Sequence, residues 1–450
     1  MSKESALSGR AREHLFSRVA SMRNLESNAR EVPDQRALQA RFTDFATLPG
    51  YDELRMQRTV AEKLGLENPF FKVHDGRINA RTVMDGRTLI NFSGYDYLGL
   101  NGHPEVVEAA KAAIDHYGIS CSASRVVAGE RPIHRSLERA LADHYSVEES
   151  VVFVSGYATN VSVIAQLVGA KDLVISDAAI HNSAVVGSVL SGAARRSFQH
   201  NDLDNLDQIL GSVRGKFERV LIVVEGLYSM DGDFPDLPKL IEIKKRHNAW
   251  LMIDEAHALG VLGRRGLGLF EHFDVDPREV DIWMGTLSKT LAGCGGYIAG
   301  SATLVDYLRC MAGGFVYSVG IPPVVAASVQ KALELMHREP ERVTQLQKNG
   351  AYFLEYAKSK GLDTGFGRGT SVTPIVVGDS LGAVILSQEL SHRGINVQPV
   401  IYPAVPPKSA RLRFFITSMH TKQDIETTVD TIVEEIAKLP ERMQAMKTMA

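Results

Sequence analysis

A series of short apolar runs, separated by stretches with helical spacing, constrains the fold of this 450-residue chain more than any other feature. The runs are Val151–Val154, Leu173–Ser176, Val220–Glu225, Trp250–Asp254, Ile282–Gly285 and Tyr297–Ala299. Continuous apolar runs of this length are typical of strands that are buried on both faces of a parallel sheet. Their alternation with helices predicts an α/β fold, in which helices cover both faces of a mostly parallel central sheet.

We expect this sheet to form the core of a large domain, residues 101–335, in which Pro104 opens an early helix. A long helix after Pro322-Pro323 runs toward Arg338, and a smaller C-terminal α+β lobe, residues 336–450, follows it. The strands of this lobe are expected near Thr373–Val377, Val397–Val400 and Leu412–Thr417, and its last helix begins at Asp424.

The N-terminal part is expected to be a helical extension, residues 1–65. Arg12–Arg23 and Asp52–Leu64 have helical apolar spacing, and Gly65 suits a helix end. No residue of this extension carries recognisable chemistry. It is either a partly ordered arm or a surface for a partner protein or a second subunit.

Residues 66–100 are expected to form an N-terminal segment with short strands. The two β-like runs are Phe70–Val73 and Thr88–Phe92, and Asp85-Gly86 between them is a turn signal.

Composition excludes several classes of protein. The formal net charge is -3 with both signs spread along the chain, so no nucleic-acid-binding surface is indicated. The three cysteines form no Cys-x-x-Cys pair, which argues against a zinc site or a disulfide framework and favours the reducing cytoplasm. No run approaches the roughly 18 apolar residues of a membrane span, and the N-terminus lacks an apolar signal core.

Lys289 is the first candidate for chemistry, because it follows a buried strand that ends in Gly285 and Thr286. Ligands of open α/β sheets bind beyond the carboxyl ends of the strands. A lysine there can form a Schiff base with a carbonyl compound such as pyridoxal phosphate. For a lone lysine, however, a solvated surface position is the more common explanation.

Asp254 and His257 strengthen this interpretation, because they end the strand that precedes the Lys289 strand. A carboxylate keeps a pyridine nitrogen protonated, which lets the ring withdraw electrons from a carbanion. The competing hypothesis is an NTPase, since Asp254-Glu-Ala-His257 also matches a helicase-type acidic motif. That class needs an upstream Gly-x-x-x-x-Gly-Lys-Ser/Thr loop, and the chain has none; near Lys289, Ser288 stands where the glycine is required.

Four further positions give weaker signals. Gly156 and Tyr157 open a helix after a strand, where backbone N–H groups bind phosphate. His181 lies just past the next strand and could stack on a flat ring or simply be solvated. Ser229 lies in a crowded polar turn and could bind a phenolic oxygen. Arg411 and Arg413 share one face of a strand, so one could hold a carboxylate or form an ordinary edge-strand salt bridge.

Together these motifs resemble the α-oxoamine synthase family of pyridoxal-phosphate enzymes, from about Asn68 to about Ala437. The motifs that carry the resemblance are Tyr97-Leu-Gly-Leu100, Ser124-Arg125 with His134 and Glu138, Glu225-Gly-x-x-Ser-Met-Asp-Gly-Asp233, Asp254-Glu-Ala-His257, Gly285-Thr-x-x-Lys289 and Arg411-Leu-Arg413. The resemblance implies a transferase of fold type I that works as a homodimer, with sites at the subunit interface.

The resemblance also implies roles around the cofactor ring. Lys289 is the residue that forms the Schiff base, and Asp254 pairs with the pyridine nitrogen. His257 and Ser229 are expected to contact the phenolic oxygen.

Further implied contacts are made to the two faces of the cofactor ring and to its phosphate. His181 stacks on one face of the ring, and the methyl group of Ala256 lies on the other. Gly156, Tyr157 and Thr286 bind the phosphate.

The remaining implied contacts concern the substrate and the second subunit. Arg413 holds the amino-acid carboxylate, and Ser318 reaches in from the neighbouring subunit. Tyr95 and Ser124 are expected to contact substrate; Ser124 stands where glycine-specific relatives carry threonine, so alanine or serine is as acceptable as glycine.

Three departures from the family pattern are visible. Asp96 replaces an asparagine of the Tyr-Asn-Tyr-Leu-Gly motif, which puts that residue's substrate contact in doubt. The stretch Tyr317–Pro322 is less hydroxylated than the usual form, which weakens the assignment of Ser318. The stretch Asn68–Gly76 resembles synthase domains that work beside polyketide assembly lines, so an acyl carrier protein is as acceptable a donor as acyl-CoA.

The sequence therefore predicts a cytoplasmic acyltransferase that condenses a small L-amino acid with an acyl thioester and releases CO2 and thiol. Lys289 removes the Cα proton, and His181 or Lys289 assists later proton transfers. Three alternatives remain: an aminotransferase of the same fold, a Cα–Cβ lyase, and a non-catalytic cofactor-binding or scaffold protein.

Overall fold

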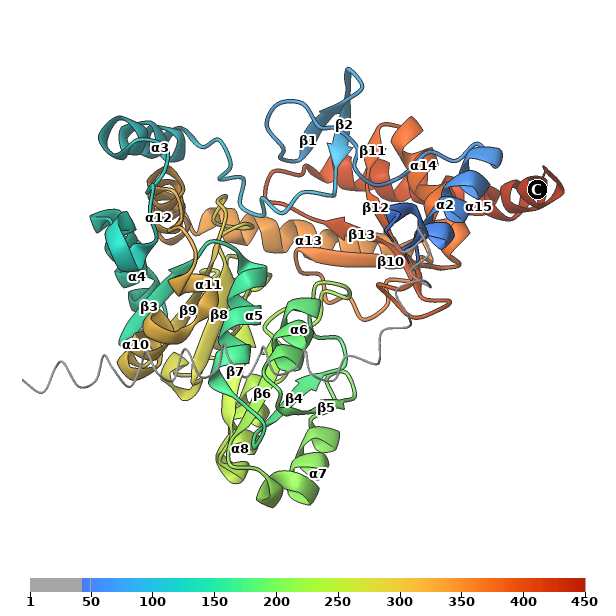
Figure 1. The fold of residues 1–450 in the computed structure, drawn as a ribbon. Helices are drawn as coiled ribbons and strands as arrows, with labels where there is room; N and C mark the ends of the chain where they lie inside the picture. Colours follow the sequence, from blue (N-terminus) through green and yellow to red (C-terminus); the bar gives the residue numbers. More distant parts are fainter. Residues whose placement is uncertain (1–42, 49, 450) are drawn as a thin grey trace, which may run out of the picture. The chain divides into compact units, whose positions relative to one another are not determined.

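The computed structural model describes residues 43–48 and 50–449, which form two units (Figure 1). One unit ends at Gly65, and the other comprises Leu66–Met449. The first contains the 3₁₀ helix η4 (Phe45–Thr47) and the helix α2 (Tyr51–Lys63). Helix α2 confirms the helix expected at 52–64, and Gly65 has φ +66°, as a glycine that ends a helix requires. The helix expected at 12–23 lies outside the described residues, and the boundaries at 100 and 335 stay predictions.

A seven-stranded sheet is the centre of the second unit (Figure 1). Its strands are β3 (Glu149–Phe153), β4 (Leu173–Asp177), β5 (Ala194–Phe198), β6 (Val220–Glu225), β7 (Trp250–Asp254), β8 (Ile282–Thr286) and β9 (Gly296–Gly300). They are ordered β3-β9-β8-β7-β6-β4-β5. Only β9 runs against its neighbours, so the sheet is mostly parallel, as predicted.

All six expected strands are confirmed to within two residues, and β5 was missed. Its sequence, Ala-Arg-Arg-Ser-Phe, is polar because β5 is an edge strand and three of its five residues are exposed. The opposite edge strand, β3, is buried and was predicted, so apolar runs fail only where an edge strand is exposed.

Side-chain alternation along the strands divides the core into two clusters, one on each face of the sheet. In β6, for example, Val220, Ile222 and Val224 belong to one cluster, and Leu221 and Val223 belong to the other. One face is covered by α5 (Gly156–Leu167), α6 (Asn182–Leu190), α10 (Ala302–Met311) and α11 (Gly313–Val316). The other is covered by α4 (Pro132–His144), α7 (Leu203–Val213), α8 (Leu237–His247) and α12 (Pro323–Arg338).

The segment before the large sheet forms a three-stranded sheet of β1 (Arg81–Met84), β2 (Arg87–Asn91) and β11 (Ile395–Asn396). Asp85-Gly86 is the hairpin turn, but the prediction of a strand at Phe70–Val73 was wrong. Phe71 has φ +60° and is 94% exposed, so this run neither extends nor packs as a strand must. The strand that pairs with β2 is β1, which begins at Arg81. Its first residues are polar, so it does not read as an apolar run.

The C-terminal part is a second α+β layer, built on β10 (Val372–Gly378), β13 (Ala410–Phe415) and β12 (Gln398–Val400). The remaining long helices are α3 (Pro104–Tyr117), α13 (Glu341–Ser359), α14 (Ser380–His392) and α15 (Lys422–Met449). Because β13 lies between β10 and β12, the expectation that Arg411 and Arg413 sit on an edge strand was wrong. Among the described residues, no helix is long and apolar enough to cross a membrane.

Candidate active site

The strands β4, β6, β7 and β8 are parallel and end at the same edge of the sheet, where the predicted chemistry gathers. β6 ends at Glu225 and β7 ends at Asp254, which are paired in register. Lys289 follows β8 by three residues, and His181 follows β4 by four. Topology therefore brings together residues that are up to 108 positions apart, as the numbers 181 and 289 show.

Lys289 is half-buried in the Leu66–Met449 unit. Burial lowers the pKa of its ammonium group to about 8, while the nearby Asp254 and Glu225 carboxyl groups act in the opposite direction. Its Nζ lies 5.9 Å from the centre of the Tyr95 ring. A lysine whose pKa is close to neutrality can act as a nucleophile toward carbonyl compounds or as a base.

Asp254 is only 5% exposed and both of its oxygens are hydrogen-bonded. Oδ1 accepts from the backbone N–H of Ala256 at 2.9 Å, and Oδ2 accepts from the Asn160 amide on α5 at 2.8 Å. Two donors favour the ionised carboxylate, which has lone pairs left for a cationic partner.

His257 is buried and held by aromatic residues from distant segments. Its Nδ1 lies 2.6 Å from the Tyr97 hydroxyl, and its ring stacks on Phe415 at 6.1 Å between centroids and 11° between planes. Burial lowers the pKa of His257 well below its ordinary value, helped by the Lys289 and Arg413 charges. His257 is therefore a neutral, oriented imidazole.

His181 is the N-cap residue of α6 and is fixed by Ser183. Its Nδ1 lies 2.7 Å from the Ser183 hydroxyl, which itself accepts from Asn160 at 2.9 Å. Burial lowers the pKa of His181, although the Asp254 charge opposes this. Asn160 thus connects the residue that orients His181 with Asp254.

Gly156 and Thr286 lie against each other where α5 begins. A Cβ on Gly156 would stand 2.9 Å from the Thr286 Oγ1, so only glycine allows the two residues to pack this closely. The Thr286 hydroxyl donates to the carbonyl of Gly295 at 3.0 Å and accepts from the Ser288 N–H at 3.3 Å. Tyr157, the next residue of α5, is 48% exposed. The start of a 12-residue helix beside a hydroxyl is suited to a phosphate group.

Arg411 and Arg413 have different hydrogen-bond partners, although they lie on the same face of β13. Arg411 forms an ion pair with Asp231 at 2.5 Å. Arg413 donates instead to the backbone carbonyl of Ser229 at 3.1 Å and lies 4.6 Å from the Phe415 ring centre. No carboxylate of the described residues forms an ion pair with Arg413, so its guanidinium can receive one from a ligand.

A cavity of about 420 Å³ opens beside Lys289. Its lining includes Tyr95, Asp96 and Ser93 from the segment after β2, and Ile78 and His74 before β1. Asp96 does not point a free carboxylate into it, because its oxygens accept from the backbone N–H groups of Leu100 at 2.8 Å and Asn101 at 3.1 Å. Asp96, which stands where relatives have asparagine, therefore stabilises the turn that follows it.

Ser124 and Ser318 lie beside each other, because Ser124 forms an isolated β-bridge with Val319. Neither lines the cavity that contains Lys289. No hydrogen bond among the described residues joins their side chains to Lys289, Asp254, His257 or His181, so the roles of Ser124 and Ser318 stay predictions.

Sequence reasoning missed Asn160, Tyr97 as a partner of His257, and Phe415. Asn160 lies one helical turn after Gly156, on the α5 face that meets the sheet, so its position could have been a signal. The contact of Phe415 with His257 joins residues 158 positions apart and leaves no local pattern.

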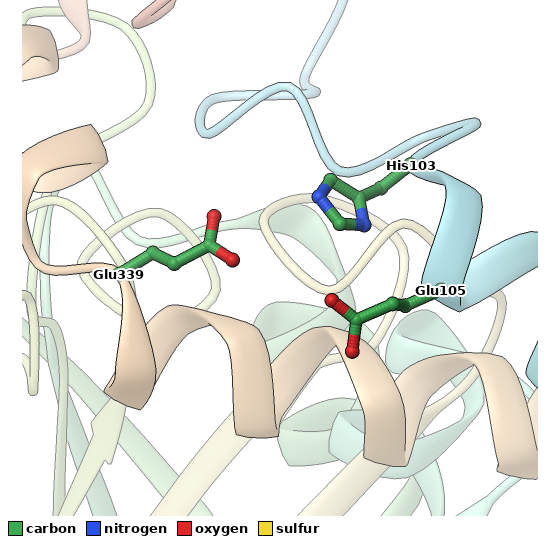
Figure 2. A group of neighbouring side chains, drawn as sticks. All are labelled: His103, Glu105 and Glu339. Carbon is green, nitrogen blue, oxygen red and sulfur yellow. The ribbon is translucent and has the colours of Figure 1, made fainter.

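A second group of titratable residues lies away from the strand ends. Figure 2 shows His103 and Glu105, at the start of α3, facing Glu339 just after α12. Arg338 donates to Glu105 at 3.0 Å and to Glu339 at 2.9 Å, and Arg342 donates to Glu339 at 2.7 Å. Both carboxylates are thus neutralised by arginines, so we interpret this group as an ion-pair network.

Comparison with known proteins agrees with this geometry. The model of the family "Aminotransferase class I and II" matches residues 87–432. The 8-amino-7-oxononanoate synthase of Symbiobacterium thermophilum is 40% identical over 365 residues, which are 81% of this chain and 92% of that protein. The enzyme of the same name from Cellvibrio japonicus is 38% identical, over 78% and 88% of the two chains.

Solved structures of serine palmitoyltransferase have the same fold. The enzyme from S. paucimobilis with a bound pyridoxal phosphate–myriocin adduct has a TM-score of 0.84 and 26% identity, covering 88% of this chain and all of that chain. The Sphingomonas wittichii enzyme has a TM-score of 0.84 and 28% identity, covering 88% and 99%.

The chain therefore belongs to the aminotransferase class I and II family and, within it, to the α-oxoamine synthases. It has the fold of type I pyridoxal-phosphate transferases, its cofactor is pyridoxal 5'-phosphate, and its class is that of the pyridoxal-phosphate-dependent acyltransferases.

Proposed function

We propose that this protein condenses a small L-amino acid with an acyl thioester, with loss of CO2 and thiol, to give an α-aminoketone. The observation that carries the proposal is a cavity lined by Lys289, which follows the end of the parallel strand β8 and whose charge interacts with that of Arg413. The names of the relatives support it, since a serine palmitoyltransferase joins an amino acid to an acyl group.

Three features of the site fit pyridoxal 5'-phosphate. Gly156 lets the start of α5 pack directly against Thr286, which places the first backbone N–H groups of the helix, a hydroxyl and Tyr157 together for a phosphate. Asp254 is a buried carboxylate that can pair with the pyridine nitrogen. Lys289 has the lowered pKa that attachment of the cofactor needs.

Further contacts are assigned around the ring. The neutral His257 and the Ser229 hydroxyl would bind the phenolic oxygen. His181 would stack on the ring, and the methyl group of Ala256 would contact its other face. When bound, the cofactor withdraws electron density from the amino-acid Cα through its protonated ring.

Each of the following residues has its own role in the proposed reaction. Arg413 binds the substrate carboxylate and so orients the amino acid. Lys289, once released from the cofactor, removes the Cα proton, and its lowered pKa suits this role near neutral pH. Asp254 keeps the ring nitrogen protonated, and His181 or Lys289 returns protons later. Tyr95, which faces Lys289, borders the path of the acyl donor.

We infer further that two copies of the chain form the working enzyme. Apolar side chains are exposed around the bridge between Ser124 and Val319, among them Val127 at 82% and Tyr317 at 69%. A second copy would cover them, and this would allow Ser318 and Ser124 to serve the partner's site. Sedimentation of the purified protein tests this, and a monomer would contradict it.

The acyl donor is carried by coenzyme A or by an acyl carrier protein. Phe71 and Val73 are exposed on the segment that leads to His74 and Ile78, which line the cavity. An apolar surface beside the entrance suits a protein carrier. We place the reaction in the cytoplasm, where the three cysteines, all unpaired in the described structure, stay reduced.

Thiol release tests the proposal. The cofactor-loaded protein is given glycine, alanine or serine, each with short- and long-chain donors on coenzyme A or on a carrier protein. We expect release that requires one amino acid and one class of donor. Transfer of the amino group to a keto acid without thiol release would indicate an aminotransferase, and amino-acid cleavage without a thioester would indicate a lyase.

A further inference from the structure

Glu225 and Asp254 form a pair of buried carboxyl groups at the ends of two neighbouring strands. They are opposite each other in the β6–β7 register and are 4% and 5% exposed. Ionisation of one buried carboxyl group raises the free energy of ionising its neighbour. This repulsion favours a proton on one of the two, although the charges of Lys289 and Arg413 oppose it.

The available hydrogen-bond donors decide which one is protonated. Both oxygens of Asp254 receive a donor at 2.8–2.9 Å, from Asn160 and from the backbone of Ala256. Oε2 of Glu225 accepts from the Ser229 N–H at the longer distance of 3.3 Å, the backbone amide of His181 faces the carboxyl group, and Oε1 has no side-chain or backbone partner within hydrogen-bond distance in the part of the chain that is described. A buried carboxylate with fewer and longer hydrogen bonds is the costlier one to ionise. Asp254 thus carries the charge, and Glu225 carries the proton.

The groups that face Glu225 come from every neighbouring element. They are Asp254 on β7, Lys289 after β8, Arg413 on β13, Tyr228 after β6 and the backbone amide of His181. Burial, followed by the Asp254 charge, raises the pKa of Glu225 to about 8, and Lys289 opposes this. Glu225 can therefore change its charge in the same pH range as Lys289.

We propose that Glu225 is a positioning residue of the Lys289 site. As a neutral acid it leaves Asp254 as the single negative charge at the strand ends. When it ionises, it adds a second charge that holds a proton on the Lys289 nitrogen. This role goes beyond the proposed reaction and depends on it only in that the cofactor is attached to Lys289.

The chain offers a matched control at the next strand end. Glu255 is also buried, and burial raises its pKa to about 8 as well. Its two oxygens accept from the Leu269 N–H, and the only charged group that acts on it is Asp254. Glu255→Gln therefore removes a similar buried acid that does not act on Lys289.

The first experiment is a pH titration of the absorbance of the lysine-linked cofactor, without substrate. In the unaltered protein two coupled groups titrate, so the curve is broader than a one-proton transition. In Glu225→Gln we expect a one-proton curve with its midpoint lower by on the order of one pH unit, because no second charge holds the proton. Glu255→Gln should keep the broad curve and its midpoint. Glu225→Asp keeps an acid, so its curve should stay broad, with a midpoint lowered by less than in Glu225→Gln.

An unchanged curve in Glu225→Gln would overturn the proposal, as would an equal change in both Gln variants. If Glu225→Gln does not fold, Glu225→Asp carries the test, because withdrawing the carboxyl group by one methylene must shift the curve. An unchanged midpoint in that variant would also contradict the role.

A second experiment needs no cofactor. A carboxyl group whose pKa rises from 4.5 to about 8 on folding stabilises the folded protein below pH 4.5, and this stability is lost as the pH rises toward 8. Glutamine cannot ionise, so the Tm of Glu225→Gln relative to the unaltered protein should increase from pH 5 to pH 9. A difference that does not depend on pH would show that Glu225 is not a protonated acid in the folded chain.

The two experiments separate this inference from the proposed function. If the protein binds no cofactor at Lys289, the proposed function fails while the Tm measurement still tests the protonation of Glu225. If cofactor binds and thiol is released but the curve does not depend on Glu225, only the inference fails.

Discussion

Two groups of titratable side chains in the Leu66–Met449 unit are built in opposite ways. Around His103, Glu105 and Glu339, two arginines satisfy both carboxylates (Figure 2); Glu105 is exposed, and the other two residues are half-buried. At the strand ends, Lys289 and Arg413 have no carboxylate partner among the described residues, and their pKa values are lowered by burial. Exposed ion pairs contribute little to the free energy of folding, whereas buried charges without an ion-pair partner are typical of ligand-binding sites.

The largest expected effect comes from the lysine. Lys289→Ala should abolish the absorbance of the lysine-linked cofactor and lower thiol release by about 10³-fold or more, because both the attachment point and the base are lost. Lys171→Ala is the control, since this exposed lysine pairs only with the surface residue Glu218. If the linked absorbance persisted in Lys289→Ala, the active site would have to lie elsewhere.

Asp254→Asn should have the next largest effect. The amide keeps the shape but not the charge that holds the ring nitrogen protonated, so we expect kcat to fall by about 10²- to 10³-fold. Steady-state thiol release measures this, with the exposed Asp204→Asn as the control. Unchanged kcat in Asp254→Asn would mean that the carboxylate only supports Asn160 and the turn after β7.

Arg413→Lys should act on the substrate rather than on the chemical step. A lysine loses the two-pronged hydrogen bonding of guanidinium, so KM for the amino acid should rise by about 10- to 100-fold with little change in kcat. Arg411→Lys should leave KM unchanged, because Arg411 is occupied by Asp231. Equal effects of the two substitutions would contradict the difference between the arginines.

Gly156→Ala should weaken cofactor binding by about tenfold, because the added methyl group would stand 2.9 Å from the Thr286 Oγ1 and would displace the start of α5, to which the phosphate is assigned. Titration of the cofactor-free protein with pyridoxal phosphate measures the affinity. Gly169→Ala is matched to it, since its Cβ would meet no atom within 4 Å. Equal affinity of the two variants would remove Gly156 from the phosphate site.

The smallest effect is expected at the group in Figure 2. Adding Zn²⁺ or Mg²⁺ should not raise Tm, and Glu339→Gln should change Tm by less than about 2 °C, because solvent screens these ion pairs. A metal-dependent rise in Tm that is lost in Glu339→Gln would mean that this group is a metal site after all.

The central sheet was predictable from sequence because its strands are buried on both faces and read as continuous apolar runs. The same logic failed at β5 and β1, whose side chains are largely polar. It also failed at Phe70–Val73, where apolar residues are exposed and only a folded structure reveals that no strand forms.

At the site, Lys289, Asp254 and His257 could be placed from the strand ends on which they lie. The contacts that determine the orientation and the pKa of these residues could not be predicted. Tyr97 reaches His257 across 160 positions, and Asn160 reaches Asp254 across 94. Such contacts depend on the packing of segments that leave no periodic pattern in the chain.

The most direct test of the account is the ratio of CO2 to thiol released from an amino acid labelled at its carboxyl carbon. The proposed condensation predicts one labelled CO2 for each thiol, and neither product in Lys289→Ala. Thiol release without labelled CO2, or labelled CO2 without any requirement for a thioester, would contradict it.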